Sequence, residues 1–300
     1  MSSIGTQQFF VGTASWTDTT LVNTDLFYPP GMKGAEDRLN FYAAHFNTVE
    51  VDATYYALLA ERNAQLWAER TPPGFIFNIK AFGLLTGHAV ATARLPKVIK
   101  EMLSPAERVA PRLERPAPEV LDQAYQMFWS ALLPLRDAGK LGPLLFQFPP
   151  YFTCRRSNFD QLVRIRERLP DALIAIEFRH PSWTEEPPNR GATLEFMRDH
   201  RFIHVVIDAP SAPSIPPMVL AATADDAYIR FHGRNRDNWF RRDISVAERY
   251  QYLYAESELG EWADRIKQLT GVRRAFAIFN NCYSNFGIMN ASTMKEMLER

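Results

Sequence analysis

The sequence predicts a (β/α)₈ TIM barrel that spans residues 1–300 as one domain, and three observations lead to this fold class. Eight short apolar segments recur along the chain, each bounded by turn residues. Amphipathic helical patterns separate most of these segments, which is typical of strands that alternate with helices. No glycine-rich phosphate fingerprint follows the first segment, and this favours a closed barrel over a doubly wound sheet. The chain also has no internal repeat, so a single domain is expected.

The predicted strands are continuous apolar runs rather than strictly alternating ones. Such runs are typical of a parallel sheet that is buried on both faces. In chain order they occupy residues 9–15 (FFVGTAS), 48–53 (TVEVDA), 75–82 (FIFNIKAF), 142–148 (GPLLFQF), 172–178 (ALIAIEF), 202–208 (FIHVVID), 227–233 (AYIRFHG) and 275–281 (AFAIFNN).

Helical periodicity and stop signals predict the elements between the strands. The segment between the third and fourth strands, 83–141, is too long for one helix and predicts a long helical insertion. Residues 210–226, between the sixth and seventh strands, are proline-rich, so the helix there is expected to be reduced or missing. The predicted helices cover 35–46, 61–70, 118–140 with a break near Pro134, 158–169, 191–200, 245–269 and 289–300.

The composition narrows the class of protein. The net charge is zero, so no overall field draws the molecule to nucleic acid or to an anionic membrane. Two cysteines, Cys154 and Cys282, are too few for a disulfide framework. No stretch approaches the roughly 20 apolar residues of a membrane span, and MSSIGTQQFF lacks the pattern of a signal peptide. We therefore expect a cytoplasmic protein without a membrane partner, and the sequence leaves its oligomeric state open.

Polar residues gather at the C-terminal ends of the predicted strands, where TIM barrels carry their active sites. In the fifth strand, a period of two places Ala175, Glu177 and Arg179 on the inward face. Buried charges need partners, so one interpretation is a structural lattice of ion pairs. The other is a catalytic pocket, which we favour because barrel interiors can be filled with Val, Ile and Leu. The candidate catalytic residues are Glu50, Asp52, Lys80, Glu177, Arg179, Asp208 and His232.

The seventh strand and its loop predict an anion-binding mouth. Residues 230–243 (RFHGRNRDNWFRRD) contain several arginines, whose guanidinium forks suit phosphate or carboxylate. A charged loop paired with Asp237 and Asp243 is the alternative for the outer arginines. Aromatic residues at strand ends could stack on sugars or bases, or belong to the core; they are Trp16, Tyr55, Tyr56, Phe82, Trp183, Trp239 and Tyr283.

Metal-binding patterns are weak in this chain. His88, His180 and His232 fall near strand ends, and with Glu50, Glu177 and Asp208 they could build a divalent site. No HExxH or CxxC spacing is present, so we predict no cofactor and keep a divalent metal as the minor alternative.

The motifs, taken in order, resemble a known family. They are GTASW (12–16), VEVDATYY (49–56), FNIKAF with LTGH (77–88), GKLGPLLFQFPPYF (139–152), AIEFRHPSW (175–183), IDAP (207–210), YIRFHGRN (228–235) and FNNCYSNFGIMNA (279–291). Together they are similar to the YecE-like family, domain of unknown function 72. The resemblance implies a TIM barrel. It carries over the positions Glu50, Asp52, Tyr55, Lys80, His88, Gln147, Glu177, Arg179, His180, Trp183, Asp208, Arg230, His232, Gly233 and Asn280.

We predict an enzyme that acts on a small or terminal anionic substrate, phosphorylated or sugar-like. Glu177 or Glu50 would serve as acid or base, while Lys80 and Arg230 stabilise negative charge. The alternatives are a non-catalytic ligand-binding barrel and a nucleic-acid-processing protein, the latter by the fold-level likeness of such barrels to endonuclease IV. The candidate substrate-binding residues are Trp16, Tyr55, His88, Gln147, His180, Trp183, Arg230, Gly233, Asn280 and Asn281.

Overall fold

The computed structural model describes residues 7–300 and shows eight parallel strands arranged as a nearly closed barrel. Neighbouring strands follow the order β1-β10-β9-β8-β7-β6-β3-β2. The seam between β1 and β2 is joined by a bridge between Ala14 and Glu50, and by a 2.8 Å hydrogen bond from the Ser15 amide to the Glu50 carbonyl. The strands are β1 (Gln8–Thr13), β2 (Thr48–Val51), β3 (Ile76–Lys80), β6 (Leu141–Gln147), β7 (Ile174–Glu177), β8 (Phe202–Asp208), β9 (Asp226–Phe231) and β10 (Arg274–Phe279). The predicted barrel is confirmed.

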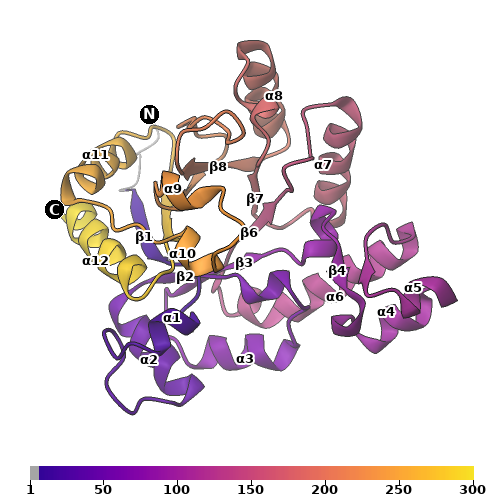
Figure 1. Ribbon diagram of the computed structural model, residues 1–300, viewed down its shortest axis with the longest axis horizontal. Helices are drawn as coiled ribbons and strands as arrows, with labels where there is room; N and C mark the ends of the chain where they lie inside the picture. The colour runs from indigo at the N-terminus through magenta and orange to yellow at the C-terminus, as the bar shows by residue number, and fades with distance from the viewer. Residues whose placement is uncertain (1–6) are drawn as a thin grey trace.

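Helices surround the strands, as Figure 1 shows. Their inner faces and the outer faces of the strands form one large apolar cluster, to which Ile176, Phe178 and Trp262 belong. The surrounding helices are α2 (Ala35–His45), α3 (Glu61–Glu69), α6 (Pro118–Asp137), α7 (Arg156–Arg168), α8 (Pro187–Asp199), α11 (Glu256–Lys267) and α12 (Phe286–Glu299).

A second, smaller apolar cluster fills the interior of the barrel. Its side chains alternate along each strand with those of the outer cluster, as the period of two requires. In β7, Ala175 lies inside while Ile176 lies outside. This parity continues to Glu177, so the charged end of the strand is directed into the barrel.

The predicted insertion between the third and fourth barrel strands is present. After β3 the chain forms η2 (Gly83–Thr86), β4 (Val90–Ala91), η3 (Thr92–Arg94), α4 (Lys97–Met102), α5 (Pro105–Val109) and β5 (Arg112–Leu113) before it enters α6. The strands β4 and β5 pair as a separate antiparallel sheet. Helices α4 and α5 project from the barrel beside α6 (Figure 1).

Residues 209–225, between β8 and β9, contain no helix, which agrees with the prediction. Instead, the Thr223 hydroxyl donates to the Phe202 carbonyl and accepts from the His204 amide, so the segment is tied back to β8.

Two of the predicted helices need correction. The helix expected over 245–269 is two helices, α10 (Val246–Arg249) and α11, because Ser245 and Glu248 form a capping box around a single short turn. Residues 250–255 between them are not helical, and Tyr254 anchors this segment through its hydroxyl to Asp208. The break expected near Pro134 is absent. Pro134 lies in the last turn of α6, where the lost amide hydrogen bond does not stop the helix.

Among residues 7–300, no helix is long and apolar enough to cross a membrane. Residues 1–6, which form part of the N-terminal stretch that we judged unlike a signal peptide, lie outside the described residues. The short helix α1 (Thr19–Val22) follows β1 and is capped by Asp18.

Candidate functional site

Arg230 forms the centre of a buried charge cluster at the C-terminal ends of the barrel strands. Its guanidinium binds Glu50 with two contacts, Nε to Oε2 at 2.9 Å and Nη2 to Oε1 at 2.6 Å. The remaining nitrogen, Nη1, lies 2.5 Å from Oε2 of Glu177. All three side chains are 1% exposed or less, so the arrangement is a buried ion triad. We call Glu50, Arg230, Glu177 and Arg179 the charge lattice.

Glu177 is the most heavily bound carboxylate of the lattice. Its Oε1 contacts Arg179 Nε at 2.5 Å and accepts a 2.7 Å hydrogen bond from Gln147 Nε2. Burial raises the pKa of Glu177, but Arg179, Arg230 and His232 outweigh it and hold that pKa well below its usual range. Glu177 is therefore a fixed negative charge and is poorly suited to carry a proton.

Tyr228 completes the binding of Glu50. The strand parity places it inward, two residues before Arg230, and its hydroxyl donates to Glu50 Oε2 at 2.9 Å. Burial and the neighbouring Glu50 carboxylate raise the pKa of Tyr228 well above its ordinary value. Sequence reasoning missed this residue, although its spacing of two from Arg230 was a usable signal.

The lattice is electrically balanced. Two carboxylates, Glu50 and Glu177, face two guanidinium groups, Arg230 and Arg179. Such pairing compensates the desolvation of each charge. This part of the site therefore fits the ion-pair interpretation, and the groups outside the lattice decide what chemistry is available.

Lys80 is the cation without a partner. Among the hydrogen bonds and ion pairs of residues 7–300, none includes its ammonium. The Nζ lies instead over the Tyr55 ring, 4.9 Å from its centroid. Burial lowers the pKa of Lys80 to about 8, and the positive charge of Arg230 adds to this effect, while Glu50 and Glu177 oppose it. A lysine of this kind can gain and lose a proton near neutral pH.

Asp52 follows Glu50 by two residues and lies just beyond the end of β2. Its carboxylate has no hydrogen-bond partner among the part of the chain that the structure describes. Burial raises its pKa, the nearby negative charge of Glu50 adds to the rise, and Lys80 and Arg230 oppose it. The charge of Lys80 thus acts on Asp52, and neither residue is paired within the lattice.

His88 lies on the same side of the site as Lys80. Its Nδ1 is 2.8 Å from the Thr86 hydroxyl, and its ring meets the edge of Tyr55 at 5.2 Å between centroids. Burial lowers the pKa of His88 to about 4, and the charges of Lys80 and Arg179 add to this effect. The imidazole is therefore neutral at neutral pH and can accept or donate a hydrogen bond.

His232 lies on the opposite side, against the lattice. Its Nε2 is 3.3 Å from Arg179 Nη2 and 3.4 Å from Glu177 Oε1, and its Nδ1 is 2.9 Å from Asn280 Nδ2. Burial, with Arg179 as the next cause, lowers the pKa of His232 to about 3, so this ring is also neutral. Trp239 and Tyr250 pack beside it, with centroids 6.3 and 6.0 Å away. Tyr250 was missed because its segment was predicted to be helical.

Asp208 lies outside this group. The inward residues of β8 are Ile203, Val205 and Ile207, so Asp208 points toward the helices. It accepts hydrogen bonds from Tyr254 Oη and Trp262 Nε1, both at 2.7 Å, and pairs with Arg234. Asp208 therefore fastens the loop after β9 to α11 and does not join the barrel interior.

Two aromatic side chains that were predicted to bind substrate lie in the apolar core instead. Trp16 lies in the outer apolar cluster against Trp67, because Ser15 has a positive φ of 79° and turns the chain after β1. Trp183 is fully buried, stacks on Phe178 at 4.1 Å, and donates its indole hydrogen to the Phe152 carbonyl. Neither ring faces the charge lattice.

Three other predicted binding residues have local structural contacts. His180 caps the turn η4 (Pro181–Trp183) through Ser182. Gly233 has a φ of +82°, and a side chain there would collide with Tyr252. Asn281 is buried and binds the Tyr252 carbonyl and Asn290. These contacts position the loops around the site.

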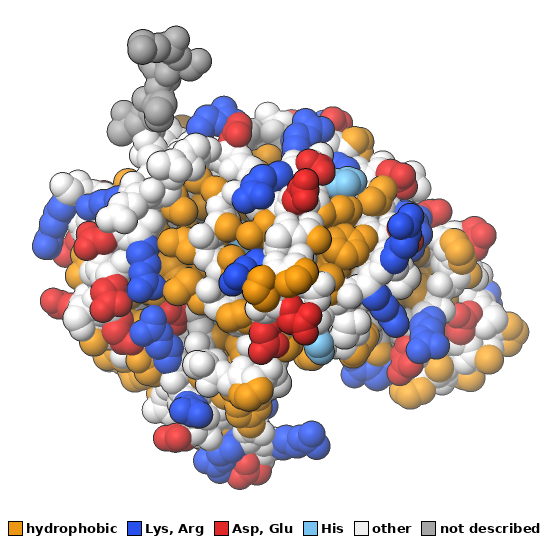
Figure 2. Space-filling view, turned by 90° about the horizontal axis from the view of Figure 1, so that it is seen from above, with side chains coloured by type: hydrophobic (Ala, Val, Ile, Leu, Met, Phe, Trp, Pro, Cys, Tyr) orange, Lys and Arg blue, Asp and Glu red, His pale blue; other side chains and the backbone are white. Residues whose placement is uncertain are grey.

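Two of the four outer arginines of the loop after β9 are paired. Arg241 binds Asp243 at 2.7 Å, and Arg234 binds Asp208 and Glu258. Positive and negative side chains are also intermixed over the face of the molecule in Figure 2. Among the ion pairs of residues 7–300, none includes Arg236 or Arg242.

Groups of three or more His, Cys, Asp or Glu side chains that could share a metal ion are absent from residues 7–300. The carboxylates considered for a divalent site are separated, since Glu50 and Glu177 bind Arg230 while Asp208 faces the helices. Cys282 is near Asp52 and donates to the Ala14 carbonyl, and burial raises the pKa of its thiol.

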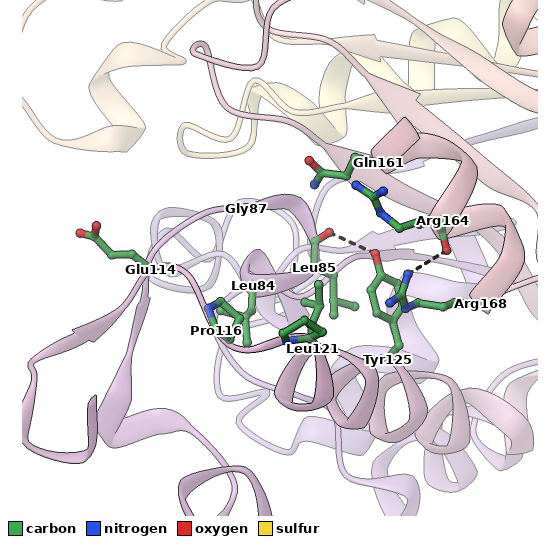
Figure 3. Close-up of a pocket in the computed structure, with 11 residues that line it drawn as sticks. Leu84, Leu85, Gly87, Glu114, Pro116, Leu121, Tyr125, Gln161, Arg164 and Arg168 are labelled. Carbon is green, nitrogen blue, oxygen red and sulfur yellow. Dashed lines mark hydrogen bonds between the residues drawn. The ribbon is translucent and has the colours of Figure 1, made fainter. Parts of the chain in front are cut away.

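The cavity in Figure 3, of about 490 Å³, lies between the insertion, α6 and α7. Apolar side chains line its floor, and Arg164 and Arg168 line one wall, with the Tyr125 hydroxyl bound to the Leu85 carbonyl. None of the predicted catalytic or binding residues lines it. This cavity is therefore separate from the strand ends.

The comparisons with known proteins agree with the fold. Residues 10–300 match the family described as "Protein of unknown function DUF72", and the chain belongs to this family. UPF0759 protein YunF of Bacillus subtilis (strain 168) is 32% identical over 296 residues, which cover 97% of this chain and 93% of that protein. The resemblance predicted from the motifs is confirmed.

Two solved structures of DUF72 family proteins are similar to this chain. The protein from Thermotoga maritima MSB8 has a TM-score of 0.77 at 32% identity and covers 98% of this chain and 100% of its own. The protein from Enterococcus faecalis V583 has a TM-score of 0.79 at 24% identity and covers 98% and 96%, which shows a shared fold. The names of these relatives state no reaction.

Proposed function

We propose that this protein is an enzyme that performs acid–base chemistry on a small anionic substrate, phosphorylated or sugar-like, at the C-terminal ends of the barrel strands. The observation that carries the proposal is the partly exposed ammonium of Lys80, which has no hydrogen-bond or ion-pair partner among residues 7–300 and lies beside a charge lattice whose members are all compensated. A titratable group with a shifted pKa in such a place is a common mark of a catalytic site.

Lys80 is the proposed proton carrier. With a pKa of about 8, a fraction of its amines is neutral at physiological pH and can accept a proton from the substrate. The protonated form can stabilise negative charge that develops during the reaction. Asp52, whose pKa is raised by burial and by Glu50, is the proposed second proton-transfer group.

The charge lattice has a positioning role in this proposal. Glu177 and Glu50 are held by arginine and stay ionised, so they do not exchange protons with the substrate. The guanidinium of Arg179 is 18% exposed and remains able to reach an anionic ligand. Neutral His88 flanks the site and can supply a hydrogen bond through Nε2, whereas neutral His232 is fully buried and its ring nitrogens contact Arg179, Glu177 and Asn280.

Tyrosine and tryptophan rings support a substrate with a flat or sugar-like face. Tyr55 meets Tyr56 edge-on at 5.0 Å, and Trp239 meets Tyr250 at 5.7 Å. The pKa of Tyr56 is raised by burial and by the nearby Asp52 and Tyr250. Rings beside polar groups commonly bind sugars and other ring-shaped ligands.

The experiment is a turnover screen with phosphorylated sugars and sugar acids. We expect Lys80→Met to lower kcat for the identified substrate by about 10²- to 10⁴-fold, the usual contribution of a general acid or base. Lys80→Arg should be equally inactive, because arginine keeps the charge but does not release a proton. The rate of the parent protein should change with an apparent pKa of about 8. Lys267→Met, on the far helix α11, is the control for loss of a lysine.

A non-catalytic ligand-binding barrel is the second candidate. It is favoured by the complete pairing of Glu50, Arg230 and Glu177, which needs no substrate to be stable. If Lys80→Met turned over the identified substrate at the parental rate, the catalytic assignment would be withdrawn. Binding of a screened compound without turnover by the parent protein would support this second candidate.

A further inference from the structure

The insertion after β3 builds a cavity next to the strand ends. Its volume is about 310 Å³, within the range of small-molecule sites. The residues of the insertion supply most of its wall, which a barrel without the insertion would lack. The lining residues are Tyr55, Tyr56, Ala89, Val90, Ala91, Arg94 and Arg112.

Tyr55 joins this cavity to the proposed catalytic site. The Tyr55 ring that lines the cavity also contacts Lys80 and His88. The Lys80 ammonium lies 4.9 Å from its centroid, and the His88 ring lies 5.2 Å away between centroids. A ligand in the cavity therefore lies about one aromatic ring away from Lys80. The two places can hold different parts of one molecule.

Two arginines of the cavity have no acidic partner. None of the ion pairs among residues 7–300 includes Arg94 or Arg112. Arg94 lies over the Tyr56 ring at 5.8 Å, and Arg112 Nη2 donates to the Ala89 carbonyl at 2.5 Å. Because Ala91 pairs with Arg112 across β4 and β5, the short turn that follows Ala91 brings Arg94 to the same cavity.

Exposed aromatic rings border this part of the molecule. Tyr56 is 56% exposed and Tyr151 is 67% exposed, although both are large rings. The Tyr151 hydroxyl donates to the Gly87 carbonyl, so the ring is anchored rather than free. Rigid exposed rings beside unpaired arginines are a combination that binds a ring-shaped anion, because each ring supplies a stacking face and each guanidinium a fork for phosphate oxygens.

We propose that this cavity is a subsite for the phosphate end of a phosphorylated sugar. Arg94 and Arg112 bind the phosphate, and the sugar lies against Tyr55 and Tyr56 with its reacting end toward Lys80. The proposal rests on the proposed function for the location of the reaction, but its own binding step does not require turnover. A nucleotide shares this chemistry, since it also carries a phosphate on a sugar.

The experiment measures binding by calorimetry with three probes: inorganic phosphate, ribose 5-phosphate and AMP. We expect ribose 5-phosphate to bind the parent protein more tightly than inorganic phosphate, and Arg94→Gln/Arg112→Gln to weaken that binding by about tenfold or more, since charge-assisted hydrogen bonds are lost. Tyr56→Ala, which leaves both arginines, should weaken ribose 5-phosphate but not inorganic phosphate. Tighter binding of AMP would assign a nucleotide, and equal binding a sugar phosphate.

The control is Arg136→Gln/Arg265→Gln, which removes two arginines far from the cavity that lie over aromatic rings, as Arg94 does, at 5.8 and 5.5 Å. This control should bind as the parent does. Equal affinity for inorganic phosphate and ribose 5-phosphate, unchanged binding in Arg94→Gln/Arg112→Gln, or no binding of either phosphorylated probe would each overturn the subsite. Lys80→Met should bind ribose 5-phosphate within about twofold of the parent, so failure of the catalytic proposal would appear in turnover alone.

Discussion

The two sides of the polar barrel end differ in how their charges are compensated. On one side Glu50, Arg230, Glu177 and Arg179 satisfy one another at 2.5 to 2.9 Å. On the other side Lys80 and Asp52 have no such partner, and their pKa values move toward neutrality. The difference teaches that charges gathered at one end of a barrel can be compensated to different degrees. The proposed function therefore depends on the uncompensated pair, Lys80 and Asp52, and not on the lattice.

The first prediction tests the compensated side with the substitution Arg230→Met. The substitution leaves Glu50 and Glu177 buried without their shared cation, and breaking a buried ion pair typically costs about 3–5 kcal/mol. We expect a loss of this size in the free energy of unfolding, measured with urea at pH 7. Lys80→Met should cost less or nothing, because it removes a partly buried charge that has no partner.

The control for Arg230→Met is Arg241→Met, which removes an arginine from the exposed pair with Asp243. Exposed pairs contribute little, so this variant should unfold like the parent. If Arg230→Met and Arg241→Met unfolded at the same urea concentration, the ion pairs of the charge lattice would not stabilise the fold more than an exposed pair does.

The second prediction uses pH. His232 has a pKa of about 3 when folded and about 6.5 when unfolded, so the unfolded chain binds a proton first as the pH falls below about 6.5. The same sign holds for His88 and His204, whose folded pKa values are about 4. Each such histidine removes about 1.4 kcal/mol of stability per pH unit in this range.

His232→Gln should therefore make the fall in unfolding free energy between pH 6.5 and 5 less steep by about 1.4 kcal/mol per pH unit, whatever its effect at pH 7. Glu177 does not disturb this window, because its lowered pKa makes it lose stability only below about pH 4.5. His45→Gln, at an exposed histidine, serves as the control for loss of an imidazole. An identical slope in His232→Gln and the parent would mean that His232 is protonated when folded.

Strand parity explains how much could be predicted from the sequence. A period of two places Glu50, Glu177, Arg230 and His232 inward, and the structure brings them together. The same rule applied to β8 places Ile207 inward and Asp208 outward, so the position of Asp208 at the end of its strand did not predict the direction of its side chain. A lattice of ion pairs was one of the two interpretations of the sequence, but which carboxylate pairs with Arg230 was not predictable, since the partners lie 53 and 180 residues away along the chain.

Loops limited the prediction in a different way. Trp16 is turned into the outer layer by the positive φ of Ser15, which a non-glycine residue rarely adopts and no sequence pattern announces. Tyr250 was not predicted as a site residue because the periodicity of its segment suggested one long helix. The capping box at Ser245 begins a helix of only a single turn. Both errors concern backbone geometry that the surrounding tertiary structure selects.

The last prediction compares one tyrosine from each side. The Tyr228 hydroxyl donates to the buried Glu50, whereas the Tyr55 hydroxyl has no hydrogen-bond partner among residues 7–300. Tyr228→Phe should lower the free energy of unfolding by about 1.5–3 kcal/mol, the range for hydrogen bonds to charged groups. Tyr55→Phe keeps the ring over Lys80 and should change stability by less than about 0.5 kcal/mol. Equal losses of unfolding free energy in these two variants would show that both hydroxyls make stabilising hydrogen bonds. The two sides of the barrel end would then not differ in how their polar groups are compensated.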